Sequence, residues 1–283
     1  MTAFALPTAA ALPKLDLSVR RFRRDEPILF GLAVVILGLM PPTAVAALVD
    51  DRTFQGLSVW DKPWKFELAL AAYTLTLVFF ARFLPAGLTS RTGYRLYASA
   101  VAAAILLELA WVAGAAAMGA ASHFNTTPFG QAVYSLMGLL AVLLTSMSAF
   151  YAFAIARNGR TGLAPALHLS LVLGLAMVLP LTLVTAGFMS SAGGHAVGAL
   201  PGATDAGGLI LLGWSREHGD LRVAHFFATH ALHVLPAFGV ASAWAWGADR
   251  TAPVWIFAGG YALLVAYAFA GALAGQPFLP FLG

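Results

Sequence analysis

The composition of this 283-residue chain indicates an integral membrane protein. Hydrophobic residues make up 60% of the chain and charged residues only 10%, whereas soluble domains carry roughly 25% charged residues. Cysteine is absent, which excludes disulfides, thiolate-bound iron–sulfur clusters and cysteine catalysis. The net charge of +4 gives no reason to expect a nucleic-acid partner, because Lys and Arg gather in short loops for topological reasons.

Several apolar segments are each long enough to cross a bilayer as a helix of about 20 residues. Helix-breaking residues and charged residues divide the apolar sequence into seven predicted spans, near residues 27–49, 64–84, 94–120, 131–156, 164–189, 223–247 and 253–275. We therefore predict an all-α integral membrane helical bundle, in which residues 27–283 form a single domain after a basic segment, 1–26. The start of the chain also resembles a cleavable signal peptide, with its basic segment, an apolar run and the sequence AVA at 44–46. The apolar stretch continues to Val49, so we expect the first span to be retained.

Basic residues are distributed unevenly between the two sides of these spans. One side has eleven of them: Lys14, Arg20, Arg21, Arg23, Arg24, Arg82, Arg91, Arg95, Arg157, Arg160 and Arg250. The other side has five: Arg52, Lys62, Lys65, Arg216 and Arg222. Short cytoplasmic loops are enriched in Lys and Arg, so we expect a cytoplasmic N-terminus and a C-terminus on the outer side.

The sixth predicted span carries three histidines within nine residues, His225, His230 and His233. Ionisable groups at membrane depth are costly and commonly functional. A helix rises about 1.5 Å per residue, which puts His233 about 16 Å below the outer interface. Glu108 in the third span lies at a similar depth, and His123 is level with His225. We expect these groups to form a polar column if the third and sixth spans are neighbours.

Two kinds of chemistry fit this column. Imidazole is a common ligand of transition metals and haem, so we predict that His123, His225 and His230 bind a metal or haem for a redox role. Glu108 and His233 would then transfer a proton as catalytic residues. The alternative is a proton relay in a transporter or channel, because intramembrane Glu and His chains are typical of pumps. A sensor without chemistry and a lipid-modifying enzyme are weaker alternatives, and the residues identify neither the small molecule or ion nor the oligomeric state.

The loop between the fifth and sixth spans, residues 190–222, is long and rich in glycine and contains LILLGW at 209–214. Structureless loops of this length are uncommon unless they serve as caps or lids. We call it the lid and predict that it covers an outward-facing site between the second, third and sixth spans. Tryptophan is enriched at membrane interfaces, so we expect Trp214 to anchor the lid there.

Three stretches, WDKPWKF at 60–66, ASHFNTTP at 121–128 and GDLRVAHF at 219–226, resemble motifs of a family of uncharacterised multi-spanning bacterial inner-membrane proteins. The resemblance covers most of the chain, from the first outer loop to the sixth span. It implies a bacterial inner membrane, with the C-terminus in the periplasm, and adds no catalytic residue. Since all three stretches fall on the predicted outer side, they add Lys65, Asn125, Asp220 and Arg222 as candidate residues for binding a cofactor. Asp220 and Arg222 would position the lid or orient a histidine.

Overall fold

A computed structural model describes residues 16–54, 56–200, 208–209 and 212–279. Seven helices in this part are long and apolar enough to cross a membrane, as predicted. They are α2 (Pro27–Val49), α3 (Asp61–Phe80), α4 (Thr92–Ala117), α5 (Pro128–Ala156), α6 (Pro165–Ser191), α7 (Leu221–Trp246) and α8 (Ala252–Leu273). A short helix, α1 (Val19–Asp25), precedes them. Each predicted boundary lies within four residues of the observed one.

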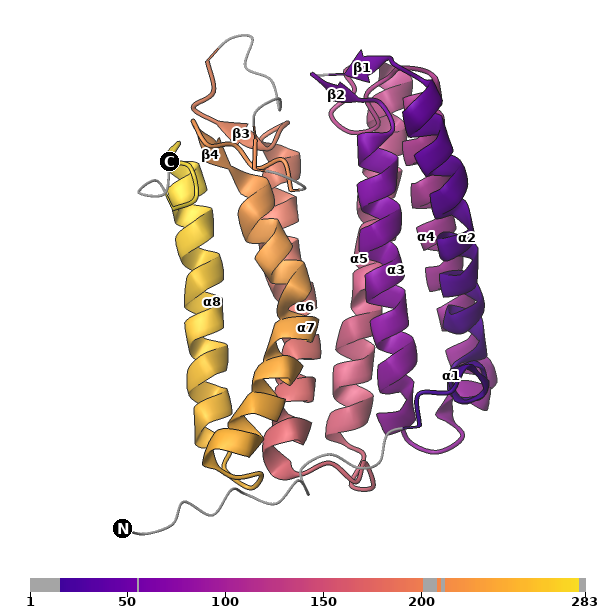
Figure 1. Cartoon of the computed structure of the whole chain (residues 1–283), viewed down its shortest axis with the longest axis vertical. Helices are drawn as coiled ribbons and strands as arrows, with labels where there is room; N and C mark the ends of the chain where they lie inside the picture. Colours follow the sequence, from indigo (N-terminus) through magenta and orange to yellow (C-terminus); the bar gives the residue numbers. More distant parts are fainter. Residues whose placement is uncertain (1–15, 55, 201–207, 210–211, 280–283) are drawn as a thin grey trace.

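The bundle has two distinct ends (Figure 1). At the basic end lie α1, the 3-10 turns η1 (Ala81–Phe83) and η2 (Leu88–Ser90), and the α5–α6 and α7–α8 connections. At the hairpin end lie two short antiparallel hairpins. They are β1 (Thr53–Phe54) with β2 (Leu57–Ser58), and β3 (Ala196–Val197) with β4 (Gly219–Asp220). The histidines of α7 lie on the hairpin side of that helix's midpoint or close to it, because α7 begins at this end.

Proline and capping side chains account for where several helices begin. Pro128 and Pro165 occupy the first position of α5 and α6, where the missing N–H costs nothing and the fixed φ suits a helix. Thr127 caps α5 by accepting a hydrogen bond from the N–H of Gly130. Asp220 caps α7 in the same way through the N–H of Arg222, so the sequence fixes the start of the histidine-bearing helix.

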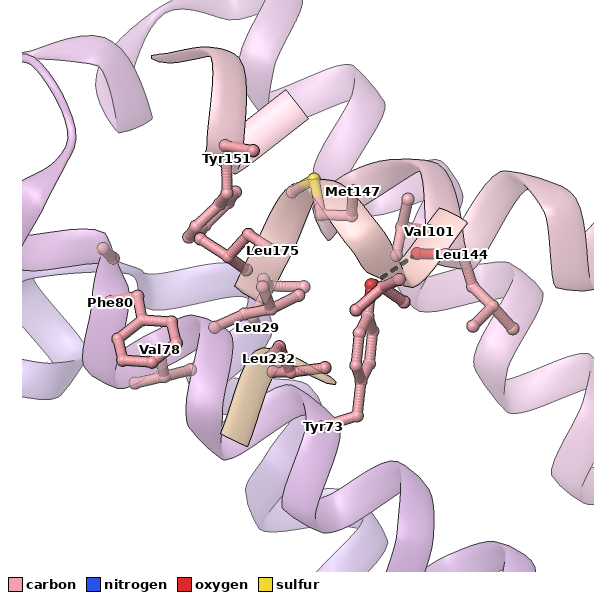
Figure 2. Close-up of a cluster of buried hydrophobic side chains, with 14 of the residues drawn as sticks. Leu29, Tyr73, Val78, Phe80, Val101, Leu144, Met147, Tyr151, Leu175 and Leu232 are labelled. Atoms are coloured by element: carbon pink, nitrogen blue, oxygen red, sulfur yellow. Dashed lines mark hydrogen bonds between the residues drawn. The ribbon is translucent and has the colours of Figure 1, made fainter. Parts of the chain in front are cut away.

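The helices pack as two groups that α5 and α6 join. In the first group α4 packs on α2, α3 and α5, and in the second α7 packs on α6 and α8. The third and sixth predicted spans, α4 and α7, are not among the helix pairs that pack together, so the condition for the predicted polar column is not met. Buried side chains of both groups meet in one core, in which Leu29, Leu175 and Leu232 lie together (Figure 2). Within it the hydroxyl of Tyr73 donates to the carbonyl of Leu144 at 2.7 Å, which satisfies the one polar atom of that ring.

Two glycines allow α6 and α7 to approach closely. A Cβ on Gly174 would lie 2.9 Å from the carbonyl oxygen of Ala231 and 3.0 Å from Cδ of Pro236. A Cβ on Gly239 would lie 1.9 Å from Oγ of Ser170. Small residues at helix interfaces are the usual means of close packing in membranes. The position of α7, and of its histidines, depends on this contact.

We predict that Gly174→Ala destabilises the protein by about 1–3 kcal/mol, because the added methyl meets backbone atoms that cannot move independently. Gly187 lies in the same helix with open space around its Cα. Gly187→Ala is therefore the matched control, and we expect it to leave the melting temperature unchanged or slightly raised. Thermal unfolding of both variants in detergent measures the difference. Equal melting temperatures would contradict the close α6–α7 contact.

Candidate functional site

A hydrogen-bonded string connects α7 to α3. Nδ1 of His230 lies 3.1 Å from Nδ1 of His233, and Nε2 of His233 lies 2.9 Å from Oγ1 of Thr76. All three side chains are partly accessible, although they lie within the predicted spans. We call these three residues the string. It joins the second and sixth predicted spans, two of the three that the sequence analysis placed around the site.

The hydrogen bonds of Thr76 fix the proton positions along the string. Its hydroxyl donates to the carbonyl of Ala72 at 2.7 Å, as threonine in a helix often does. A hydroxyl has a single proton, so Oγ1 of Thr76 must accept from Nε2–H of His233. Nδ1 of neutral His233 is then an acceptor, and His230 donates its Nδ1–H to it. Donors and acceptors thus follow one direction, from His230 through His233 to Thr76.

His225 lies one and a half turns before His230 and is not bonded to it directly. Its Nδ1 lies 3.5 Å from Oγ1 of Thr185 on α6, at the limit of a hydrogen bond. The Thr185 hydroxyl donates to the carbonyl of Leu181 at 2.9 Å, so the imidazole is the donor to Thr185. This leaves Nε2 of His225 with its lone pair available as an acceptor.

The lid reaches the string through aromatic rings. Trp214 is only 8% exposed and packs edge to face on Phe226, with ring centroids 5.2 Å apart. Phe226 in turn lies over His230, with centroids 4.0 Å apart. The prediction that Trp214 anchors the lid at the membrane interface is therefore wrong: its ring faces the protein interior. Residues 201–207 and 210–211 of the lid, including part of the apolar patch, lie outside the described residues.

Asp220 and Arg222 hold the lid in this position. The Asp220 carboxylate is 1% exposed and accepts hydrogen bonds from the N–H of Ser215 and from the guanidinium of Arg222. The same guanidinium donates to the carbonyl of Gly213 at 2.7 Å, next to Trp214. The suggestion that this pair positions the lid agrees with these bonds. Binding of a cofactor by either residue stays a prediction.

His123 lies apart from the string, in the α4–α5 connection at the hairpin end. Its ring meets Phe66 and Tyr134 edge to face, and its Nδ1 lies 3.2 Å from Oγ of Ser122. Burial, together with a smaller effect of the positive charge of Lys62, lowers the pKa of His123 to about 3. The ring is therefore neutral at physiological pH.

Lys65 and Asn125 have structural partners. The Lys65 ammonium pairs with Asp61 at 2.7 Å, one helical turn away, and a Cβ on Gly213 would lie 3.4 Å from it, so Lys65 lies beneath the lid. Oδ1 of Asn125 accepts from the N–H and hydroxyl of Thr127, which shapes the turn before α5. Neither contact identifies a ligand.

Two buried glutamates lie in the hairpin half of the first helix group. Glu108 is 5% exposed, its Oε1 has no hydrogen-bond partner, and it interacts electrostatically with Lys62. Glu67 is 3% exposed and accepts from the hydroxyl of Thr43 at 2.6 Å. Glu108 was singled out in the sequence as a carboxylate at membrane depth, whereas Glu67 was not among the candidate residues. Since α4 does not pack on α7, the structure gives no support to pairing Glu108 with His233.

A third buried glutamate was not anticipated. Glu26, between α1 and α2 at the basic end, is fully buried and accepts hydrogen bonds from the hydroxyls of Tyr94 and Tyr151 and the N–H of Leu29. Burial raises the pKa of its carboxyl, and the hydrogen bond from Tyr94 opposes that rise. In the sequence Glu26 looks like an ordinary acidic cap before proline, so its burial carries no local signal.

The three predicted metal ligands do not converge. His225 turns toward α6, His230 pairs with His233, and His123 lies among aromatic rings. Within the described residues there is no group of three or more His, Asp or Glu side chains arranged to hold a metal ion. Comparisons with protein-family models, curated proteins and solved structures found no match. The function is therefore argued from geometry alone.

The low pKa of His123 predicts a loss of stability in acid. The folded state binds this proton more weakly than the unfolded chain, whose histidine pKa is about 6.5. The contribution of neutral His123 to the free energy of unfolding is fully present above about pH 6.5. It is lost as the pH falls toward about 3. We expect His123→Gln to lessen the drop in melting temperature between pH 6.5 and pH 4. The measurement is thermal unfolding across this range, and a variant with the wild-type pH profile would contradict the burial of this ring.

Proposed function

We propose that this protein moves protons through the membrane along the string, as part of proton-coupled transport. The observation that supports it most is the unidirectional pair of hydrogen bonds from His230 through His233 to Thr76. An imidazole can accept a proton on one nitrogen while releasing another from its second nitrogen, so two imidazoles in series form a relay. Chains of intramembrane histidines and carboxylates are typical of pumps and transporters.

Protons enter this relay from the hairpin end in our proposal. His225 follows the start of α7 by less than two turns, and its Nε2 is available as an acceptor. His225 and His230 are five residues apart, a rise of about 7.5 Å, so a bridging water is required between them. Lys62 and Glu108 lie in the same half of the bundle and set the electrostatic potential near the entry. In this proposal Glu108 acts on the relay through its charge, and the proton transfer predicted for it from the sequence stays a prediction.

The orientation in the membrane is part of this proposal. Ten of the described Lys and Arg residues lie at the basic end and five at the hairpin end, which favours a basic end in the cytoplasm. With seven spans the C-terminus then lies on the other side, in the periplasm of a bacterial inner membrane. The relay would carry protons inward from the periplasmic side. His230 takes up a proton on Nε2 and passes its Nδ1 proton to His233, and His233 releases its Nε2 proton to water on the cytoplasmic side, since the Ala72 carbonyl that ends the string accepts a hydrogen bond but not a proton.

A second candidate is metal binding for a redox role, now centred on a different pair of residues. Two nitrogens bound at 2.0–2.1 Å to a tetrahedral ion lie roughly 3.3 Å apart. The two Nδ1 atoms of His230 and His233, at 3.1 Å, come close to this spacing. Both Nδ1 atoms would then be deprotonated, with solvent completing the coordination. Haem binding by His123, His225 or His230 stays a prediction without a converging pair of ligands.

Proton flux into liposomes tests the proposal. We expect wild-type protein, reconstituted with a potassium gradient, valinomycin and an internal pH dye, to acidify the lumen faster than empty liposomes. His230→Ala and Thr76→Val each break the string and should reduce the rate roughly tenfold or more. Wild-type flux no greater than that of empty liposomes would contradict proton conduction.

Thr145→Val is the matched control. Thr145 on α5 also donates to a carbonyl four residues back, at 2.7 Å, but is not part of the string. This variant should retain wild-type flux. Elemental analysis of the same preparations separates the two candidates, because a stoichiometric transition metal that disappears in His233→Ala would favour metal binding over the relay.

A further inference from the structure

A groove lies between α3 and α7 at the inner end of the string. Its volume is about 320 Å³, and its lining consists of Leu75, Thr76, Phe79, Phe80, Leu232 and His233. Four of these six side chains are apolar, two of them aromatic, and the polar pair is the last hydrogen bond of the string. Ligand sites commonly combine an apolar lining with a few polar groups of this kind.

The groove opens toward the lipid. Leu75 on its rim is 40% exposed. Thr76 lies about 22 Å along α3 from the hairpin end and about 6 Å from the basic end of this helix, within the length of a hydrocarbon core of about 30 Å. At this level α7 packs on α6 and α8 and meets α3 through the contact between His233 and Thr76. A molecule that reaches this groove therefore comes from within the bilayer.

The hydrogen bonds of Thr76 determine which polar group fits. Its hydroxyl already donates to Ala72 and accepts from His233. A hydroxyl oxygen has two lone pairs, so one acceptor position remains. Thr76 is partly accessible and is one of the residues that line the groove. A ligand that donates a hydrogen bond is therefore favoured over one that only accepts.

We propose that the groove binds a lipid-soluble phenol or quinol, with its hydroxyl donating to Oγ1 of Thr76. The aromatic ring packs on Phe79 and Phe80, and its alkyl tail extends past Leu75 into the bilayer. Lipid tails and phosphate groups offer no hydrogen-bond donor, so they would leave the Thr76 acceptor unused. This site goes beyond the proposed proton conduction, and binding does not require the string to conduct.

Photolabelling tests the site. A 4-alkylphenol that carries a diazirine is added to wild-type protein in nanodiscs, with 4-octylphenol or 4-octylanisole as competitor. We expect crosslinks to concentrate in residues 72–80 and 229–236. The phenol should compete about five-fold better than its methyl ether, which corresponds to one net hydrogen bond. Labels spread evenly over the lipid-facing helices, or equal competition by both compounds, would overturn the proposal.

Variants separate this site from the relay. Leu75→Trp fills the groove and leaves the string atoms in place, so labelling should fall about five-fold while proton flux persists. Thr76→Val should remove the preference for the phenol over the anisole, whereas the control Thr145→Val should keep it. His230→Ala should stop flux and retain labelling. Undiminished labelling in Leu75→Trp would overturn the assignment to this groove, whatever the flux measurement shows.

Discussion

The fold of the functional region depends on one constraint, that a polar side chain inside the hydrocarbon core must find its partners within the protein. The string meets this demand through three successive hydrogen bonds. His230 donates to His233, His233 donates to Thr76, and the Thr76 hydroxyl donates to the backbone carbonyl of Ala72. The requirement also sets direction. A threonine whose single proton is committed to its own helix forces the tautomer of His233, and His233 in turn forces that of His230. A chemical polarity along the membrane normal thus follows from ordinary hydrogen-bond valence.

The surrounding structure serves to keep these atoms in register. Gly174 and Gly239 bring α7 close to α6, so the histidines project toward α3 across a narrow gap. At the hairpin end, the buried Asp220 ties the start of α7 to the lid. Trp214 then presses on Phe226, which lies against His230. A change in the lid would therefore reach the first imidazole of the string through two aromatic contacts, which gives the lid a direct mechanical route to the proposed relay.

The sequence predicted how deep each residue lies in the membrane but did not predict which helices pack together. Hydropathy located seven spans because the bilayer fixes their length, and the rise per residue placed the histidines at membrane depth. Depth cannot say which helices touch, so the sequence could not show that α4 and α7, which carry Glu108 and His233, are not a packed pair. Thr76 escaped notice because one hydroxyl in an apolar helix has no distinguishing pattern. Trp214 was misassigned because tryptophan suits both an interface and an aromatic core, and only the fold decides between them.

The most direct test of the account is the protonation state of the two imidazoles, observed by nitrogen NMR of histidine-labelled protein in lipid. The account predicts that, near neutral pH, His233 is protonated on Nε2 and bare on Nδ1, that His230 is protonated on Nδ1, and that a coupling is seen across the bond between the Nδ1 atoms. Thr76→Val should shift the Nε2 signal of His233. Protonation of both rings on Nε2 alone would contradict the string, and loss of the Nδ1 proton of His230 together with a bound ion would replace it with a metal site.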